Sequence, residues 1–234
     1  MKKNLLLMLL SIHLFYSGIS QKKSYFTTGG EMIFSFANIE SVNSHQNLMR
    51  WSPVFNIQTM LNYDMSDRLG LFTGLAIRNV GYIIDDYKTN LVPATTVKKK
   101  FRSYNLALPV GIKIGNLAKT FLYAGYEIEL PISYKEKTFD GGDKIDKITG
   151  WFSDRQELFQ HGFLVGIQFP RTVSLKFKYY VSEFHNQQFV DGSGNRPYAG
   201  LKSNIFYFSL SSFLFRDLQM TETKTAKPTP TAVM

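Results

Sequence analysis

Apolar and polar residues alternate strictly along this chain, in one segment after another. Between residues 101 and 115 the even positions carry mostly Leu, Val, Ile and Tyr, and the odd positions carry mostly small or polar residues. Successive side chains of a β-strand point to opposite faces, so this pattern predicts a strand with one apolar face. An amphipathic helix would repeat every 3.6 residues and would not sort the residues in this way.

The alternation predicts eight strands in total. They cover residues 25–37, 51–64, 69–83, 101–115, 120–134, 158–169, 172–184 and 203–215. The first and the last of these are apolar on both faces, whereas the other six have one apolar face. After the N-terminal segment no run of eighteen or more apolar residues occurs, so we expect no transmembrane helix.

The connections between the predicted strands alternate between short and long. Three are tight turns, at residues 65–68, 116–119 and 170–171, and four are long, at residues 38–50, 84–100, 135–157 and 185–200. Short turns at one end and long loops at the other are typical of bacterial outer-membrane barrels. The sequence therefore predicts an all-β fold, an eight-stranded antiparallel up-and-down transmembrane β-barrel with short periplasmic turns and long extracellular loops.

A soluble ligand-binding barrel, such as a lipocalin, is the alternative, and it would place the apolar faces inside. The polar faces favour the membrane barrel, because they hold Asn, Gln, Gly, Ala and mutually compensating charges where a solvent-facing surface would be richer in Lys and Glu. The composition, 44% hydrophobic and 15% aromatic, excludes a disordered chain. The absence of cysteine excludes a disulfide scaffold, a thiolate metal site and a lipoprotein acylated on cysteine.

The N-terminus has the layout of a secretory signal. Lys2 and Lys3 precede an apolar stretch, and Gly18 and Ser20 supply the small side chains that signal peptidase accepts, which predicts a signal peptide at residues 1–20. The apolar stretch is shorter than the roughly 20 residues of a spanning helix, which disfavours a membrane anchor.

The exported chain is predicted to form a barrel over residues 21–216, followed by a disordered periplasmic tail over residues 217–234. Both termini are then periplasmic. Removal of the signal takes the formal charge from +9 to +7, because the signal contains two lysines. The basic residues are scattered, which argues against a nucleic-acid partner and favours contact with anionic lipid.

Charged residues also occur on the predicted inward faces. They are Glu31, Arg78, Lys113, Glu127, Glu129, Lys176 and Lys178. The interior of an eight-stranded barrel is just wide enough for side chains, so we expect these charges to form an ion-pair network that fills it. An ion path or a proton relay is the alternative role of the same residues.

One pair of residues has the chemistry of a hydrolytic site. If the turn at residues 170–171 sets the register, facing residue numbers sum to 341 or 342, and His161 lies opposite Val181 and diagonal to Glu183. Both side chains would point toward lipid near the long loops. A histidine oriented by a carboxylate is the base half of a hydrolytic triad.

The His161 and Glu183 pair resembles the lipid A deacylase family, in which a His and a Ser lie two residues apart on one outward strand and a Glu lies on its neighbour. The chain departs from this pattern, because Phe159 and Phe163 occupy both positions two residues from His161. The missing nucleophile favours the simpler interpretation of a histidine and a glutamate at the headgroup level.

A second resemblance covers most of the layout. Residues 19–21 (Ile-Ser-Gln), 102–113 (Arg-Ser-Tyr-Asn-Leu-Ala-Leu-Pro-Val-Gly-Ile-Lys) and 122–127 (Leu-Tyr-Ala-Gly-Tyr-Glu) look like the PorT-like outer-membrane β-barrel family. The specific residues span about one hairpin. The resemblance implies an outer-membrane barrel; many members of that family have no assigned activity, and one branch belongs to a protein-secretion and gliding apparatus.

Other candidate sites are weaker. Asp140, Asp143 and Asp146 in the longest loop are candidate calcium ligands, although their spacing is not that of an EF-hand and a solvated turn is the alternative. A basic run near the outer rim could contact lipopolysaccharide phosphates, with a solvated loop as the alternative; its residues are Lys98, Lys99, Lys100 and Arg102. Aromatic residues at strand ends are predicted to form interfacial girdles; they include Trp51, Tyr63, Tyr104, Tyr134, Phe159 and Phe169.

Together these features predict a non-enzymatic outer-membrane barrel with a filled polar interior. Its role would be structural or binding, through the loops, or that of a subunit in an envelope or secretion assembly. The alternative is a lipid A-modifying hydrolase that uses His161 and Glu183. No cofactor is expected, and the expected partners are outer-membrane lipid and lipopolysaccharide, the outer-membrane assembly machinery, and envelope or secretion proteins.

Overall fold

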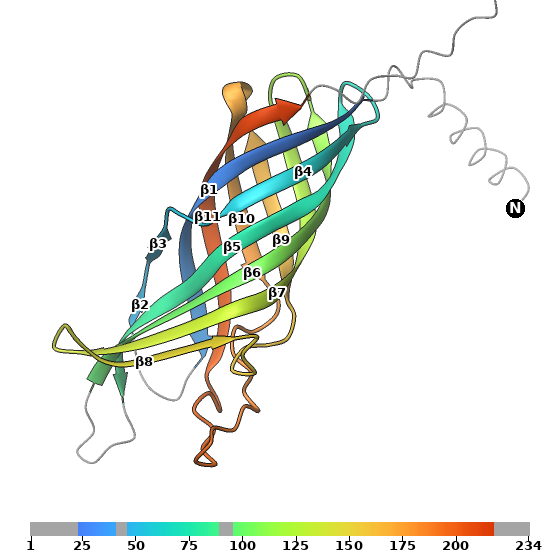
Figure 1. Ribbon diagram of the computed structural model, residues 1–234. Helices are drawn as coiled ribbons and strands as arrows, with labels where there is room; N and C mark the ends of the chain where they lie inside the picture. The colour runs from blue at the N-terminus through green and yellow to red at the C-terminus, as the bar shows by residue number, and fades with distance from the viewer. Residues whose placement is uncertain (1–22, 41–45, 89–95, 218–234) are drawn as a thin grey trace, which may run out of the picture.

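Eleven strands form in the computed structural model, which describes residues 23–40, 46–88 and 96–217 (Figure 1). They are β1 (Lys23–Glu40), β2 (Gln46–Leu48), β3 (Arg50–Ser52), β4 (Ile57–Asp64), β5 (Leu69–Lys88), β6 (Thr96–Gly115), β7 (Phe121–Asp140), β8 (Asp143–Trp151), β9 (Gln160–Gln168), β10 (Val173–Tyr180) and β11 (Lys202–Asp217). A 3-10 turn, η1 (Pro170–Thr172), joins β9 to β10. The predicted signal peptide and all of the predicted tail beyond Asp217 lie outside the described residues.

Eight of the strands close into a ring. The order is β11, β10, β9, β7, β6, β5, β4 and β1, and β1 returns to pair with β11. Every pairing in the ring is antiparallel. The predicted eight-stranded up-and-down barrel is therefore confirmed, as is the predicted register across η1, where Gln168 faces Ser174 and Gly162 faces Tyr180.

The two ends of the barrel differ. The three short connections lie at one end, which we call the turn end, and the longer connections lie at the other, the loop end (Figure 1). Strands β5, β6 and β7 have 20 residues each, about twice the roughly 9 to 11 residues of a membrane strand. They continue past the ring at the loop end, where β8 pairs with β7.

Three of the predicted loops are wrong in part. Residues 38–40, 46–48 and 50 belong to β1, β2 and β3. Residues 84–88 and 96–100 belong to β5 and β6, and most of the segment 135–157 is the hairpin of β7 and β8. Their backbone ladders continue beyond the alternating pattern on which the prediction depended. The predicted strand at 51–64 is interrupted instead, because Phe55 adopts a left-handed conformation with φ of 61°.

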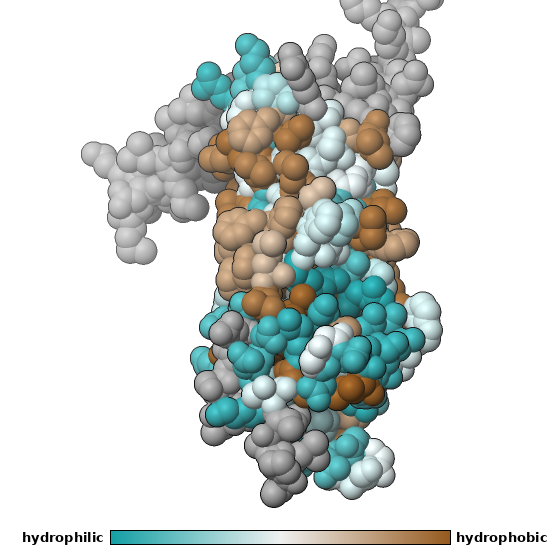
Figure 2. Space-filling view, turned by 90° about the vertical axis from the view of Figure 1, so that its left-hand side faces the viewer, coloured by the Kyte–Doolittle hydropathy of each residue, from teal (hydrophilic) through white to brown (hydrophobic). Residues whose placement is uncertain are grey.

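The outward faces nearer the turn end form an apolar belt. Exposed members of this belt include Leu71, Leu75, Ile77, Leu106, Leu108, Val110, Ile112, Leu122, Val165 and Leu175. Figure 2 shows one face of the molecule, on which hydrophobic residues gather toward the turn end and hydrophilic residues cover the loop end. Charged residues such as Arg78 and Glu127 are buried inside, which is the reverse of a lipocalin. No helix among the described residues is long and apolar enough to span a membrane.

A bulge in β7 exchanges its two faces. Tyr104 faces Ser133 and Asn105 faces Pro131, so Ile132 is an extra residue. The extra residue shifts the alternation by one position, so odd-numbered side chains point inward before the bulge and even-numbered side chains point inward after it. Tyr134 therefore points into the barrel and is 1% exposed, and its predicted place in an aromatic girdle is wrong.

Candidate functional site

Arg78 is the centre of a buried ion-pair network in the middle of the barrel. Its Nη1 donates to Glu31 Oε2 at 2.6 Å, and its Nη2 donates to Glu127 Oε2 at 2.9 Å and to Gln58 Oε1 at 3.1 Å. The side chains of Arg78, Glu31 and Glu127 are at most 1% exposed. One guanidinium therefore bridges strands β1, β4, β5 and β7 across the lumen.

Two lysines of β10 complete this network. Lys176 Nζ lies 2.9 Å from Glu31 Oε1, and Lys178 Nζ lies 2.5 Å from both Glu127 Oε1 and Glu129 Oε1. Tyr180 Oη also donates to Glu129 at 2.7 Å. The structure thus brings together six of the seven predicted interior charges.

The seventh predicted charge, Lys113, lies nearer the turn end. Its Nζ is 2.5 Å from Asp64 Oδ1 and 3.1 Å from Asn62 Oδ1. Asp64 was not among the predicted interior charges, although it is the last residue of the predicted strand 51–64, directly before the turn at residues 65–68. Its even position, shared with Asn62 and Gln58, was the available signal. With Asp64, four inward carboxylates face four inward cations in this part of the barrel.

Aromatic side chains fill the barrel at the loop end, and we call this cluster the aromatic plug. Its members are Tyr82, Phe101, Tyr134, Phe184, His185 and Tyr198, all at most 2% exposed. His185 stacks on Tyr198 with ring centroids 4.3 Å apart, and its Nε2 lies 2.8 Å from Tyr82 Oη. The last three members come from residues 184–198, which were predicted to be the end of a strand and part of a long loop. This connection folds into the barrel and closes it.

Polar contacts hold the aromatic plug in place. Glu136 Oε2 accepts hydrogen bonds from Tyr134 Oη at 2.9 Å and from Tyr198 Oη at 2.7 Å, and Lys99 Nζ lies 2.8 Å from Glu136 Oε1. Burial raises the pKa of Glu136, but Lys99 and the two hydroxyl groups outweigh it and hold this pKa below its usual range. Burial lowers the pKa of His185 to about 3, so the imidazole is neutral at pH 7.

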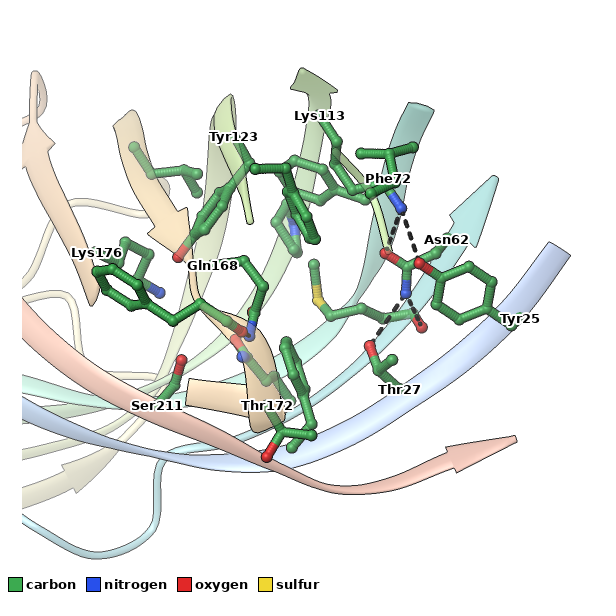
Figure 3. A pocket seen from close by; sticks show the side chains of 18 of the residues that line it. Tyr25, Thr27, Asn62, Phe72, Lys113, Tyr123, Gln168, Thr172, Lys176 and Ser211 are labelled. Atoms are coloured by element: carbon green, nitrogen blue, oxygen red, sulfur yellow. Dashed lines mark hydrogen bonds between the residues drawn. The ribbon is translucent and has the colours of Figure 1, made fainter. Parts of the chain in front are cut away.

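The lumen is hollow toward the turn end. A cavity of about 190 Å³ lies there, with Arg78 and Glu127 among its lining residues. Figure 3 shows Tyr25, Thr27, Asn62 and Lys113 gathered on one side of this cavity, where dashed lines mark their hydrogen bonds. The barrel therefore has a pocket at the turn end, a charged middle and an aromatic closure at the loop end.

Single-cysteine labelling tests this division, because the natural chain has no cysteine. A thiol at Met60→Cys, in the wall of the turn-end cavity, is expected to react with a small water-soluble maleimide in the folded protein. Ile33→Cys, which is 0% exposed beside the aromatic plug, is the matched control and should react only after unfolding. Equal labelling of both thiols in the folded protein would contradict a closed loop end.

The predicted hydrolytic pair is not assembled. His161 points outward as expected, but its Nδ1 lies 2.5 Å from Tyr126 Oη. Glu183 accepts a hydrogen bond from Gln187, and no hydrogen bond or ion pair joins it to His161 among the described residues. The hydroxyl of Ser182 contacts the backbone of His161 and not its imidazole.

The predicted basic run divides between the two faces of β6. Lys98 pairs with Asp85 at 3.0 Å on the surface, and Lys99 contributes to the interior through Glu136. Lys100 and Arg102 lie on the outer wall, where their side chains approach the rings of Phe139 and Tyr104.

The predicted calcium ligands do not converge. Asp140 faces Asp143 across the tip of the hairpin formed by β7 and β8, while Asp146 accepts a hydrogen bond from the backbone of Lys147 at 2.7 Å. Within the described ranges, no group of three or more acidic or histidine side chains is arranged to hold a metal ion.

No family model matches the chain, and no curated protein matches it. Among solved structures it is similar to Ail, the attachment invasion locus protein of Yersinia pestis, in complex with the heparin analogue sucrose octasulfate, at 11% identity and a TM-score of 0.40, over 85% of this chain and 100% of that one. It is also similar to Neisserial surface protein A, at 12% identity and a TM-score of 0.36, over 82% and 99% of the two chains.

A third similar structure is the outer membrane protein OprG from Pseudomonas aeruginosa, at 8% identity and a TM-score of 0.35, over 82% of this chain and 93% of that one. All three likenesses concern the fold alone, and the closed barrel itself is established by the pairing of β1 with β11. Membership of the PorT-like family stays a prediction.

Proposed function

We propose that this protein is a closed, non-enzymatic β-barrel of the bacterial outer membrane, with its turn end in the periplasm and its loop end outside the cell. The observation that carries this proposal is the apolar belt around a lumen that is filled by ion pairs. A closed barrel satisfies its backbone hydrogen bonds internally, as a protein in lipid must. The predicted signal peptide supports the same location.

The closed lumen favours a structural or binding role over transport. The ion pairs around Arg78 cross the middle of the barrel, and the aromatic plug closes the loop end beyond them. The long strands β5, β6 and β7, together with the shorter β8, continue as a sheet past the apolar belt, where it would present side chains to lipopolysaccharide or to other envelope proteins. A subunit of an envelope or secretion assembly fits this arrangement.

Planar-bilayer recording tests the closed lumen. We expect no stable open conductance from the purified barrel, because ions would have to displace buried, mutually paired charges. A porin reconstituted in parallel is the positive control. Large, steady channels from this protein would contradict the proposal of a plugged interior.

Location and partners need a separate experiment in intact cells. The protein should fractionate with the outer membrane and migrate differently on gels before and after heating, and external protease should cleave it only in its loop-end connections. Cross-linking followed by mass spectrometry then identifies what it contacts. A reproducible set of envelope or secretion proteins would support an assembly subunit, whereas recovery with lipopolysaccharide alone would leave a free-standing surface barrel.

A further inference from the structure

Like charges face one another on the outer wall at the loop end. Between β6 and β7, Arg102 lies opposite Lys135 and Lys100 lies opposite Lys137, and between β7 and β8, Lys137 lies opposite Lys147. Like charges directly opposite each other destabilise an antiparallel pair. Three such pairings in succession therefore need a source of compensating negative charge.

The described part of the chain supplies no such compensation. Arg50 of β3 joins four of these residues in the wall of one concavity of about 260 Å³, which we call the basic cleft; the cations lining it are Arg50, Lys100, Arg102, Lys135 and Lys137. None of these five cations forms a salt bridge with a carboxylate of the described residues.

Two further observations show that the basic cleft is electrostatically unsatisfied. The Nε of Arg102 is buried and has no hydrogen-bond partner. Partial desolvation and the nearby charges of Arg102, Lys147 and Lys137 lower the pKa of Lys135. An anion bound in the cleft would give the Nε of Arg102 a hydrogen-bond acceptor and would offset the repulsion between Lys135 and its neighbouring cations. Guanidinium and ammonium groups both donate charge-assisted hydrogen bonds to phosphate oxygens.

The position of the basic cleft indicates which anion it suits. Trp51, 58% exposed, lines the cleft, and Tyr104 lies two residues from Arg102 on the same face of β6. The next residue on that face toward the turn end is Leu106, with Ile77 paired beside it in the apolar belt. From the loop end toward the turn end, the wall therefore carries cations, then aromatic rings, then exposed aliphatic side chains. A lipid with a phosphorylated headgroup would meet these side chains in the same order, with its phosphate at the cations and its acyl chains at the aliphatic residues.

We propose that the basic cleft binds a phosphate group of an outer-leaflet glycolipid, whose acyl chains lie along Leu106 and Ile77. The proposal rests on the proposed outer-membrane orientation, and it deepens that function by naming a lipid site. It replaces the predicted contact surface at residues 98–102, since Lys98 and Lys99 are paired elsewhere and Arg50, Lys135 and Lys137 are added.

Binding can be followed through Trp51, because the chain has only one other tryptophan. The full-length Trp151→Phe protein, refolded in zwitterionic detergent micelles, is titrated with bisphosphorylated lipid A, with the same lipid after removal of its phosphates, and with inorganic phosphate. We expect the phosphorylated lipid to bind at least about tenfold more tightly than either of the others, since charged hydrogen bonds and acyl contacts are then made together.

Matched variants assign the site to the cleft. Lys100→Gln/Lys135→Gln should weaken binding of phosphorylated lipid A at least about tenfold. Lys98→Gln/Lys202→Gln removes the same net charge at the loop end from residues that already have carboxylate partners, and it should bind as the parent does. Without lipid, the cleft variant should melt no lower than the parent, because it loses like-charge repulsion.

Three outcomes would overturn the lipid site. They are equal binding of phosphorylated and dephosphorylated lipid A, equal losses in the cleft and control variants, and binding of inorganic phosphate as tight as that of the lipid, which would indicate a site for soluble anions. Failure of the outer-membrane proposal is a distinct result, because it would appear in cell fractionation of the unaltered protein whatever the binding assay shows.

Discussion

Arg78→Met is expected to destabilise the folded barrel by about 3–5 kcal/mol, the usual effect of removing one partner from a buried ion pair. The substitution leaves Glu31 and Glu127 in the lumen without the guanidinium that joins them, although each keeps a lysine. Urea unfolding of the micelle-bound protein, followed by tryptophan fluorescence and by heat-dependent gel migration, measures the change in free energy.

Two other substitutions serve as comparisons for Arg78→Met. Arg78→Lys keeps the positive charge but loses the planar fork that reaches two carboxylates, so we expect an intermediate loss of stability. Lys202→Met removes an exposed cation that lies 3.7 Å from Glu40 and should cost at most about 1 kcal/mol. Equal losses of unfolding free energy in Arg78→Met and Lys202→Met would indicate that the ion pairs around Arg78 are hydrated, which would contradict a filled lumen.

Acid is expected to weaken the closure at the loop end. The pKa of His185 is lowered by burial to about 3, against an ordinary value of 6.5. Between these values the unfolded chain binds a proton that the folded barrel does not, so the contribution of His185 is complete above pH 6.5 and is lost as the pH falls toward 3. The full loss is on the order of 5 kcal/mol.

His185→Phe separates this effect from that of the carboxylates. The variant loses the contact with Tyr82 and is expected to be less stable at pH 7, but its unfolding free energy should fall less steeply between pH 6.5 and 4.5. The pKa of Glu136 is also lowered in the folded barrel, so its loss of stabilisation on protonation falls mainly below pH 4.5 and occurs in both proteins. His161→Phe, which changes a partly exposed histidine on the outer wall, is the control for replacing a histidine by phenylalanine outside the aromatic plug. Parallel curves for all three proteins would contradict a buried neutral His185.

The ring of eight strands could be predicted because its evidence is local. Alternation along one strand reports which face meets lipid and which meets the lumen, and it needs no knowledge of the neighbouring strands. The same reasoning located Arg78, Glu127 and Lys178 inside, and the short turn at η1 set the register of β9 and β10. Asp64 followed the same alternation, but its place beside a turn concealed it.

Long-range contacts decided the remainder. The bulge at Ile132 places Tyr134 and Glu136 inside, although the alternation alone puts Tyr134 outside. His185 belongs to the aromatic plug because it contacts Tyr82 of β5 and Phe101 of β6, which are distant in the sequence. The residues around His185 in the chain do not indicate these contacts.

The sequence by itself therefore determined a closed barrel with an apolar outer surface and a charged lumen, since both follow from a two-residue period. Only the tertiary structure decided that one loop folds inward to close the barrel and that the basic cleft forms on the outer wall. Arg50, Arg102 and Lys135 come from three different strands. Their proximity depends on which strands lie side by side in the wall of the barrel, and no local sequence pattern encodes that arrangement.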